Sequence, residues 1–317
     1  MVLNISTMEK VMSQIIRKLS YNTWNIGIIE RRIEDVLFKS NIDYEVHWVK
    51  HDYRDRFFAD PFIYSVDEDV IKILVEEFLY NEKVGRISML TVKRYTYELI
   101  GNETLLKKPY HLSYPFVFLD NVGGIFILPE ASMSGVLTAY KMDELGCRLI
   151  SHKVIVPEPL CDSTIIYYQN RYWLFGTKRG KDSNSKLYIY HSQNAEGPYI
   201  PHKNNPVLFD PSIARPAGSM FVADDGDLYR LTQKNDNYYG EGVNLTKVDF
   251  LSDDKFGETL IKRLPSHVGR YKDGFHTLNG KRDICVVDGF CKEFSPVRKM
   301  IYELSSRIKK NKYSFDE

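Results

Sequence analysis

A pattern that repeats five times along the chain constrains its fold more than any other feature. Each copy has a polar residue, then a small residue or proline, then an apolar stretch. The polar positions are Asp60, Tyr114, Asp162, Arg215 and His276. Successive positions are therefore 54, 48, 53 and 61 residues apart, and periods near 50 are typical of four-stranded propeller blades. The repeat predicts an all-β chain folded as a five-bladed β-propeller.

The segments between the repeats favour short antiparallel strands. Apolar runs such as IKILVEEF, GIFILPEA, RYWLFGTK and GDLYRLTQ follow the repeated positions and are bounded by Gly, Asn and Asp turns. No strand–helix–strand alternation is visible, which argues against a doubly wound α/β fold. We expect the N-terminal strand around Trp24–Ile29 to form the outer strand of the last blade and so close the ring.

Two short helices are expected outside the propeller. Residues Met8–Leu19 place apolar side chains at helical spacing, and a second helical candidate covers Val297–Lys309. The predicted division is a helical extension over 1–20, the propeller over 21–291 and a helical tail over 292–317.

Composition excludes several classes of protein. The 43 basic and 42 acidic residues leave a formal net charge of +1, so the basic excess of most nucleic-acid-binding proteins is missing. The four cysteines form no C-x-x-C pair, and neither a zinc site nor a disulfide framework is indicated. We expect no metal and no cofactor.

The sequence shows no apolar run of the ~18–20 residues that a transmembrane helix needs. Charged residues interrupt the first 20 positions, unlike the apolar core of a signal peptide. We therefore expect a cytoplasmic protein without a transmembrane segment.

The propeller geometry predicts a shared site. The first strand of each blade lines the central channel, so the five repeated polar positions should meet in one funnel. Aromatic content is also high, with 22 Tyr and 17 Phe. Most of these rings suit β packing, but flat rings also stack on sugars.

Several motifs carry a family resemblance. They are FADPF, HLSYPFVF, the PE at Pro129–Glu130, GPYIPHKNNPV, ARPAG, LYRLTQ, YYG and GFHTL, in that order. Together they resemble the N-terminal domain of plant glucosamine inositolphosphorylceramide transferases and its bacterial relatives, over roughly Trp24 to Asp288. That domain is in turn similar to the five-bladed propellers of furanosidase-type glycoside hydrolases and related phosphorylases. The resemblance implies a carbohydrate-active propeller.

In the plant proteins a separate C-terminal glycosyltransferase domain follows, and the 317 residues leave no room for one. If this chain transfers sugar, we expect the propeller itself to do so.

Three carboxylates are the candidate catalytic residues. The related hydrolases place a base or nucleophile Asp before Pro in the first blade, which by resemblance assigns this role to Asp60. Asp162 holds the same place in the third blade and could serve as acid, base or modulator of a neighbouring pKa. Glu130 ends an apolar run, where a carboxylate is costly unless it is paired or faces the channel. Tyr114 stands where the hydrolases tend to carry a modulating Asp, and this departure disfavours simple hydrolysis.

The other candidates would bind substrate. Arg215 and His276 bring positive charge to the funnel, with an arginine fork suited to phosphate or carboxylate; Arg215 could equally pair with Asp60 or Asp162 and hold blades together. Of Glu76 and Glu77, strand alternation lets one face inward, and we favour Glu77. The remaining candidates are His111, Arg230 and Gln233 as polar contacts and Tyr114 and Tyr239 as rings that stack on sugar.

Three functions remain open. The first is a glycosyltransferase of polysaccharide or glycoconjugate biosynthesis, with a sugar donor such as a nucleotide sugar and a glycan or glycolipid acceptor. The second is a hydrolase or phosphorylase, and the third a noncatalytic glycan-binding propeller. We rank the transferase first because the cytoplasm offers activated donors more readily than polysaccharides.

Overall fold

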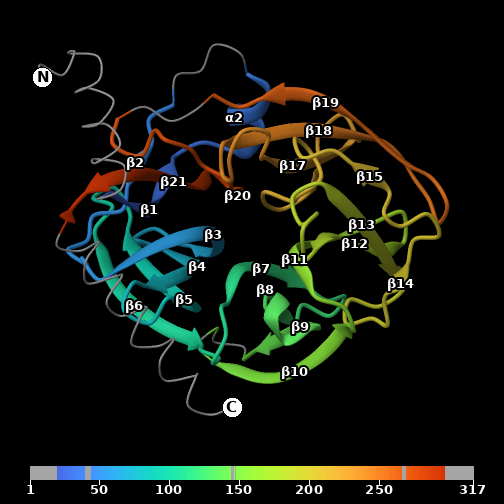
Figure 1. Ribbon diagram of the computed structural model, residues 1–317, viewed down its shortest axis with the longest axis horizontal. Coiled ribbons are helices and arrows are strands. Elements are labelled where there is room, and N and C mark those ends of the chain that lie inside the picture. The colour runs from blue at the N-terminus through green and yellow to red at the C-terminus, as the bar shows by residue number, and fades with distance from the viewer. Residues whose placement is uncertain (1–19, 40–43, 144–145, 147, 266–268, 297–317) are drawn as a thin grey trace, which may run out of the picture.

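The chain forms five antiparallel sheets set around a central axis (Figure 1). The computed structural model describes residues 20–39, 44–143, 146, 148–265 and 269–296. Each sheet is one blade, and its innermost strand lies next to the axis. The five-bladed, all-β architecture expected from the repeat is confirmed.

Blades 1 to 3 follow one another along the chain. Blade 1 contains β3 (Arg56–Val66), β4 (Val70–Leu79), β5 (Val84–Lys93) and β6 (Leu99–Leu106). Blade 2 contains β7 (Ser113–Leu119), β8 (Ile125–Glu130), β9 (Leu137–Met142) and β10 (Leu149–Val156), with the 3-10 turn η1 (Ser132–Ser134) before β9. Blade 3 contains β11 (Leu160–Tyr168), β12 (Arg171–Lys178) and β13 (Lys186–Ser192), and β13 pairs with both β14 (Ile200–Pro201) and β15 (Leu208–Phe209).

Blades 4 and 5 complete the ring. Blade 4 contains β16 (Phe221–Val222), β17 (Leu228–Lys234), β18 (Gly242–Leu251) and β19 (Phe256–Arg263). Blade 5 combines the two ends of the propeller, in the order β20 (Leu278–Lys281), β21 (Ile284–Phe294), β1 (Ser20–Ile29) and β2 (His47–Trp48).

The N-terminal strand closes the ring as expected, but it is not the outer strand. Strand β1 pairs with β21 over ten residue pairs, and β2 then covers its other edge. A β-like run at Tyr44–Val49 is visible in the sequence and contains β2, but the prediction did not place it outside β1 in the last blade.

The propeller is slightly longer than the predicted 21–291, because β1 begins at Ser20 and β21 ends at Phe294. The two predicted terminal helices fall outside the described residues. One helix, α2 (Ile33–Phe38), lies between β1 and β2 and was not anticipated. Within the described part of the chain, no helix has the length and apolar character needed to cross a membrane.

The core lies between neighbouring blades. Ile28 of blade 5 packs in one cluster with Ile63 and Ile73 of blade 1. Trp173 of blade 3 is buried in another, with Leu228 of blade 4. The apolar faces of the blades therefore bury each other, which fixes the inner strands around the axis.

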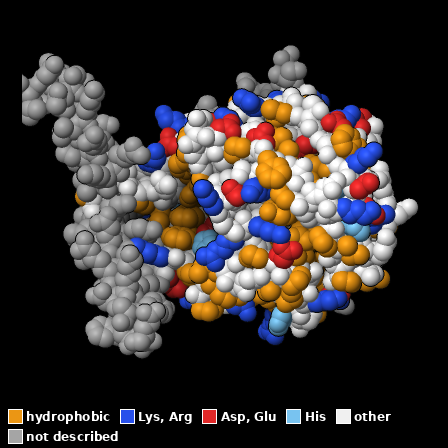
Figure 2. All heavy atoms as spheres, turned by 45° about the vertical axis from the view of Figure 1, so that its right-hand side comes forward, with side chains coloured by type: hydrophobic (Ala, Val, Ile, Leu, Met, Phe, Trp, Pro, Cys, Tyr) orange, Lys and Arg blue, Asp and Glu red, His pale blue; other side chains and the backbone are white. Residues whose placement is uncertain are grey.

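The surface carries charges of both signs. Figure 2 shows basic and acidic side chains interspersed over the face it presents, in a chain with 43 basic and 42 acidic residues.

Candidate active site

A shared backbone irregularity positions the leading residues of blades 1 to 3. Asp60, Tyr114 and Asp162 have φ angles of 51°, 44° and 45°, in the left-handed region that non-glycine residues rarely adopt. In each blade the pairing register of the inner strand shifts at that residue, which is a β-bulge. Bulges re-aim side chains, and left-handed residues cluster at functional sites. A β-bulge with a left-handed residue thus occurs at the leading position of three of the five repeats.

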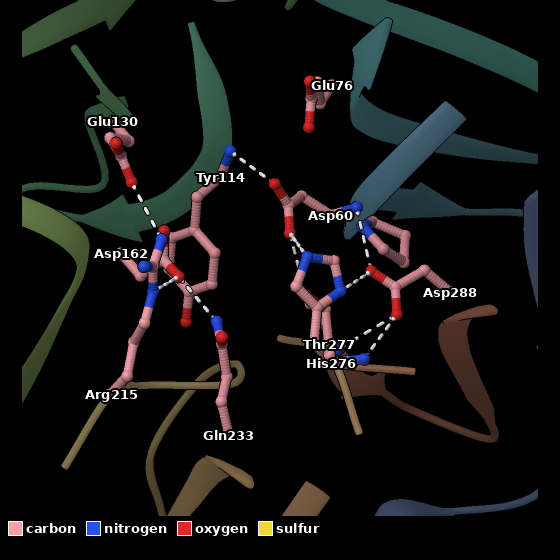
Figure 3. A network of polar contacts seen from close by, with 12 residues as sticks. Asp60, Glu76, Tyr114, Glu130, Asp162, Arg215, Gln233, His276, Thr277 and Asp288 are labelled. Atoms are coloured by element: carbon pink, nitrogen blue, oxygen red, sulfur yellow. Dashed lines mark hydrogen bonds and ion pairs between the residues drawn. The ribbon is translucent and has the colours of Figure 1, made fainter. Parts of the chain in front are cut away.

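Blades 1 and 5 meet in a charged cluster (Figure 3). The His276 ring lies between two carboxylates, with Nε2 3.3 Å from Asp60 Oδ1 and Nδ1 2.6 Å from Asp288 Oδ2. Thr277 Oγ1 donates to Asp60 Oδ1 over 2.9 Å, and the Tyr114 N–H donates to Asp60 Oδ2 over 3.1 Å. The Asp60 carboxyl thus has three polar partners, His276 and Thr277 just before β20 of blade 5 and Tyr114 of β7 in blade 2.

This cluster sets the ionisation of its members. Burial raises the pKa of Asp60 to about 6, although His276 opposes the rise. Burial alone would lower the pKa of His276, but Asp288 and Asp60 outweigh it and raise the pKa to about 9. Burial works against ionisation of Asp288 as well, yet His276 holds its pKa below the ordinary value. Near neutral pH, two carboxylates thus flank an imidazolium.

A second cluster joins blades 3 and 4. Asp162 Oδ2 accepts hydrogen bonds from Arg215 Nε over 2.6 Å and from Gln233 Nε2 over 2.5 Å. Burial opposes ionisation of Asp162, but Arg215 keeps its pKa below the ordinary value. Arg215 also donates to Asn184 Oδ1 over 2.9 Å. The alternative in which Arg215 pairs with Asp162 across two blades is the one observed.

Glu130 completes this second cluster with the opposite ionisation. Its Oε2 lies 3.4 Å from Arg215 Nη2, and its Oε1 accepts a hydrogen bond from Ser132. Burial and the neighbouring Asp162 charge raise the pKa of Glu130 to about 8, despite Arg215. Asp162 is then ionised and Glu130 protonated at neutral pH. A pair of carboxyls whose pKa values are driven apart is how acid and base roles are usually divided.

The choice of Glu77 over Glu76 was wrong. The Glu77 carboxylate is bound inside blade 1 by Arg56 and Arg86, at 2.6 and 2.7 Å, and by Ser88. Burial opposes its ionisation, but these partners lower its pKa to about 2. Glu76 instead lies near the site (Figure 3), where burial first and then Asp60 and Glu130 raise its pKa well above the ordinary value.

Arg230 also lies away from the funnel. Its guanidinium forms a buried ion pair with Glu258 of β19, at 2.8 Å, and donates to the Ile213 carbonyl. Its predicted contact with substrate is not supported, because this pair is directed to the outer strand of blade 4.

The two tyrosines differ in access. The Tyr114 ring is completely buried and packs against Phe62 at 4.9 Å, so no face is open for stacking on a sugar; its backbone N–H serves the site instead. Tyr239 is 46% exposed and lies over the Arg215 guanidinium and beside His276, at 5.3 Å from each. Tyr239 is thus the predicted ring that remains accessible.

His111 lies at the rim. Its Nδ1 accepts from the Gly85 N–H over 2.9 Å, and its Nε2 is 3.4 Å from Glu76 Oε1. Burial lowers the pKa of His111, which favours the neutral ring that this acceptor role needs.

The sequence reasoning missed Asp288 and Thr277. Asp288 lies in the apolar run ICVVDGF, where, as at Glu130, a carboxylate is costly unless it is paired or faces the channel. Asp60, His276 and Asp288 each place a ligand atom within 4.8 Å of the others, a set that could hold a divalent cation and that was not expected. In the arrangement seen, the His276 imidazolium supplies the positive charge between the carboxylates.

Two plant proteins named glucosamine inositolphosphorylceramide transferase 1 are similar to this chain. The one from Arabidopsis thaliana is 33% identical over 234 residues, which are 71% of this chain and 29% of the plant protein. The one from Oryza sativa subsp. japonica is 32% identical over 239 residues, or 73% and 31% of the two chains. The similarity therefore spans less than a third of each plant protein.

Solved structures share the fold at low identity. A thermostable family-43 glycoside hydrolase aligns with a TM-score of 0.50 and 14% identity, over 72% of this chain and 85% of the hydrolase. A β-1,3-galactosidase of the same hydrolase family aligns with a TM-score of 0.53 and 9% identity, over 68% and 81%. These likenesses establish the five-bladed architecture alone.

The family model for this part of the plant proteins matches residues 46–287. That match begins next to β2 and ends in β21, so it includes Asp60, Glu130 and Asp162 and stops one residue before Asp288. The chain belongs to the family defined by the N-terminal region of glucosamine inositolphosphorylceramide transferase 1.

Proposed function

We propose that this chain is a glycosyltransferase that moves a sugar from an activated donor to an acceptor hydroxyl in the central funnel. The observation that carries the proposal is the division of ionisation between Asp60 and Glu130. Asp60, with a pKa of about 6, is ionised at neutral pH, and Glu130, with a pKa of about 8, is protonated. The names of the plant relatives support transfer as the reaction class.

In the proposed step, Asp60 accepts the proton of the acceptor hydroxyl as its oxygen attacks the anomeric carbon of the sugar. The bond from that carbon to the leaving oxygen breaks, and its electron pair stays with the leaving group. Glu130 donates its proton, or a hydrogen bond, to that oxygen. General acid and base groups placed in this way contribute about 10²–10⁴-fold each.

The surrounding residues hold these two groups in their states. Asp288 and His276 keep the Asp60 carboxylate in place, and His276 balances the buried negative charge. Arg215 keeps Asp162 ionised despite its burial, and burial together with the Asp162 charge keeps Glu130 protonated. Tyr239, exposed beside both Arg215 and His276, offers a ring face to the sugar.

The proposed setting is the assembly of a polysaccharide or glycoconjugate in the cytoplasm. The donor would be an activated sugar such as a nucleotide sugar, and the acceptor a glycan or a glycolipid. The naming of the relatives as transferases supports the reaction class, and the rest of this setting is part of the proposal.

The test is turnover of a panel of nucleotide sugars by the full chain, with and without glycan and glycolipid acceptors. We expect sugar transfer that needs the acceptor and that falls by about 10²–10⁴-fold in Asp60→Asn. The matched control is Asp224→Asn, because Asp224 is exposed in the turn between β16 and β17. Thermal unfolding verifies that each variant is folded. A folded, fully active Asp60→Asn variant refutes the proposal, and release of free sugar without acceptor identifies a hydrolase.

A further inference from the structure

A separate cavity lies between blades 5 and 1, which are neighbours in the ring (Figure 1). Its volume is about 390 Å³, within the range of small-molecule sites. It is lined by residues 21 and 23–25 of β1, by 48–54 at and after β2, and by Arg56, Tyr80, Arg270, Tyr271 and Glu293. We call it the blade 5–1 pocket. It shares no residue with the carboxylate clusters described above.

Positive charge predominates in this pocket. Its basic side chains are Lys50, Arg54, Arg56 and Arg270, against the acidic Asp52 and Glu293. Arg56 is engaged by Glu77 and Asp55, and Arg270 Nη2 lies 3.5 Å from Glu293. Lys50 and Arg54 have no ion-pair partner among the described residues and are exposed. Two cations thus remain available to an anionic ligand.

His51, another residue that lines the pocket, has a polar atom that is not satisfied within the described part of the chain. Its Nδ1 is buried and finds no hydrogen-bond partner among the residues that the structure describes. Burial lowers the pKa of this ring, and the charge of Arg54 lowers it further, so it stays neutral. A neutral ring nitrogen in a pocket wall can accept or donate one hydrogen bond to a ligand.

Flat rings form the rest of the wall. The Trp48 and Tyr271 rings contact each other at 4.6 Å, and the Arg56 guanidinium lies over the Tyr53 ring at 4.4 Å. Tyr53 is itself exposed. Aromatic faces bind the flat or apolar faces of rings, whereas arginine forks bind phosphate. The combination fits a ring compound that carries a phosphate.

One indole connects this pocket to the proposed reaction centre. Trp24 lines the pocket, and its ring centroid lies 4.5 Å from that of His276, which holds Asp60. We propose that the blade 5–1 pocket binds the phosphate-bearing ring portion of one of the two substrates. The link to sugar transfer rests on the proposed function, whereas binding itself does not.

Two substrates could supply this chemistry. A nucleotide sugar donor carries a nucleoside diphosphate, and an acceptor could carry a sugar phosphate or a phosphorylated polyol headgroup. The pocket lies on the Asp60 side of the site, where the acceptor hydroxyl loses its proton, and this placement favours the acceptor.

The experiment is calorimetric titration of the full chain with matched charged and uncharged probes. The pairs are glucose 1-phosphate with glucose, for the acceptor, and UDP and GDP with uridine and guanosine, for the donor. We expect one phosphorylated class to bind at least about tenfold more tightly than its uncharged partner, because hydrogen bonds to charged groups are the stronger ones. In Lys50→Ala/Arg54→Ala, which removes the two available cations, that binding should weaken by about tenfold or more. Arg263→Ala, an exposed arginine on β19, is the control and should bind as the wild type does.

Each outcome decides between the alternatives. Tighter glucose 1-phosphate binding assigns the pocket to the acceptor, and tighter nucleoside diphosphate binding assigns it to the donor. Absence of binding by both classes, or binding unchanged in the double variant, overturns the proposal. Phosphate-dependent binding without any sugar transfer would retain the pocket and reject the proposed function. Sugar transfer that is unchanged in the double variant would retain the proposed function and reject the pocket.

Discussion

The Asp60 carboxylate of blade 1 lies 3.3 Å from His276 Nε2 of blade 5, so the first and last repeats meet directly at the axis. Asp288 holds the other ring nitrogen, at 2.6 Å. Closure of the ring by β1 and β21 is therefore also what assembles the proposed base. Sugar transfer and the stability of the fold should therefore both depend on the protonation of this cluster.

The pH dependence of sugar transfer should be bell-shaped. Asp60 must be ionised to accept a proton, so activity rises as the pH increases through about 6. Glu130 must be protonated to donate one, so activity falls as the pH increases through about 8. The measurement is kcat/KM from pH 5 to 10. Glu130→Gln should lose the alkaline limb, and an unchanged limb in that folded variant would remove Glu130 from the role of acid.

Asp162 should act through Glu130. Its charge raises the pKa of Glu130, so Asp162→Asn should move the alkaline limb to lower pH. Loss of a purely structural residue would reduce activity without moving the limb. The matched control is Asp224→Asn, which should keep the wild-type profile. An alkaline limb that stays in place, or moves upward, contradicts this coupling.

His276 should link stability to alkaline pH. Its folded-state pKa of about 9 lies above the ordinary 6.5, so the folded protein holds this proton more tightly than the unfolded chain. This contribution is complete below about pH 6.5 and is lost as the pH rises through about 9. Urea unfolding should give a lower free energy of unfolding at pH 9.5 than at pH 7, and this difference should be smaller in His276→Gln. An equal difference in that variant would show that other groups cause it.

Arg230 should matter for stability and not for substrate. Removing one partner of a buried ion pair costs about 3–5 kcal/mol, so Arg230→Ala should lower the free energy of unfolding by that order. The KM for the donor should change little, because the guanidinium is bound to Glu258 at 2.8 Å. Replacing both partners with Arg230→Met/Glu258→Leu should recover most of the loss. An unchanged free energy of unfolding together with a raised KM in Arg230→Ala would show that Arg230 binds substrate.

The repeat allowed the sequence to predict the blade count and the meeting of Asp60, Asp162, Arg215 and His276, because topology brings equivalent positions to one axis. It could not choose between Glu76 and Glu77. The bulge at Asp60 inserts an extra residue between Ala59 and Phe62. The regular alternation of inward and outward side chains is therefore interrupted opposite Glu76. No local pattern reveals such a shift.

Other misses could have been avoided. Arg230 and Gln233 are three positions apart on β17, so in a regular strand their side chains point to opposite faces. Gln233 reaches Asp162, and Arg230 accordingly turns toward β19. Tyr114 was different, because its burial depends on Phe62 from another blade, a contact that no sequence pattern displays.

The most direct test of the proposed reaction is a crystal structure of the chain soaked with the nucleotide sugar that it turns over. The sugar ring should lie between the carboxyls of Asp60 and Glu130, with Tyr239 against one face. A different cavity, of about 530 Å³ and lined by Phe62, Phe116 and Tyr172, offers an independent place for a ligand. A sugar bound there, with the space beside Asp60 unoccupied, would contradict the assignment of both carboxyls.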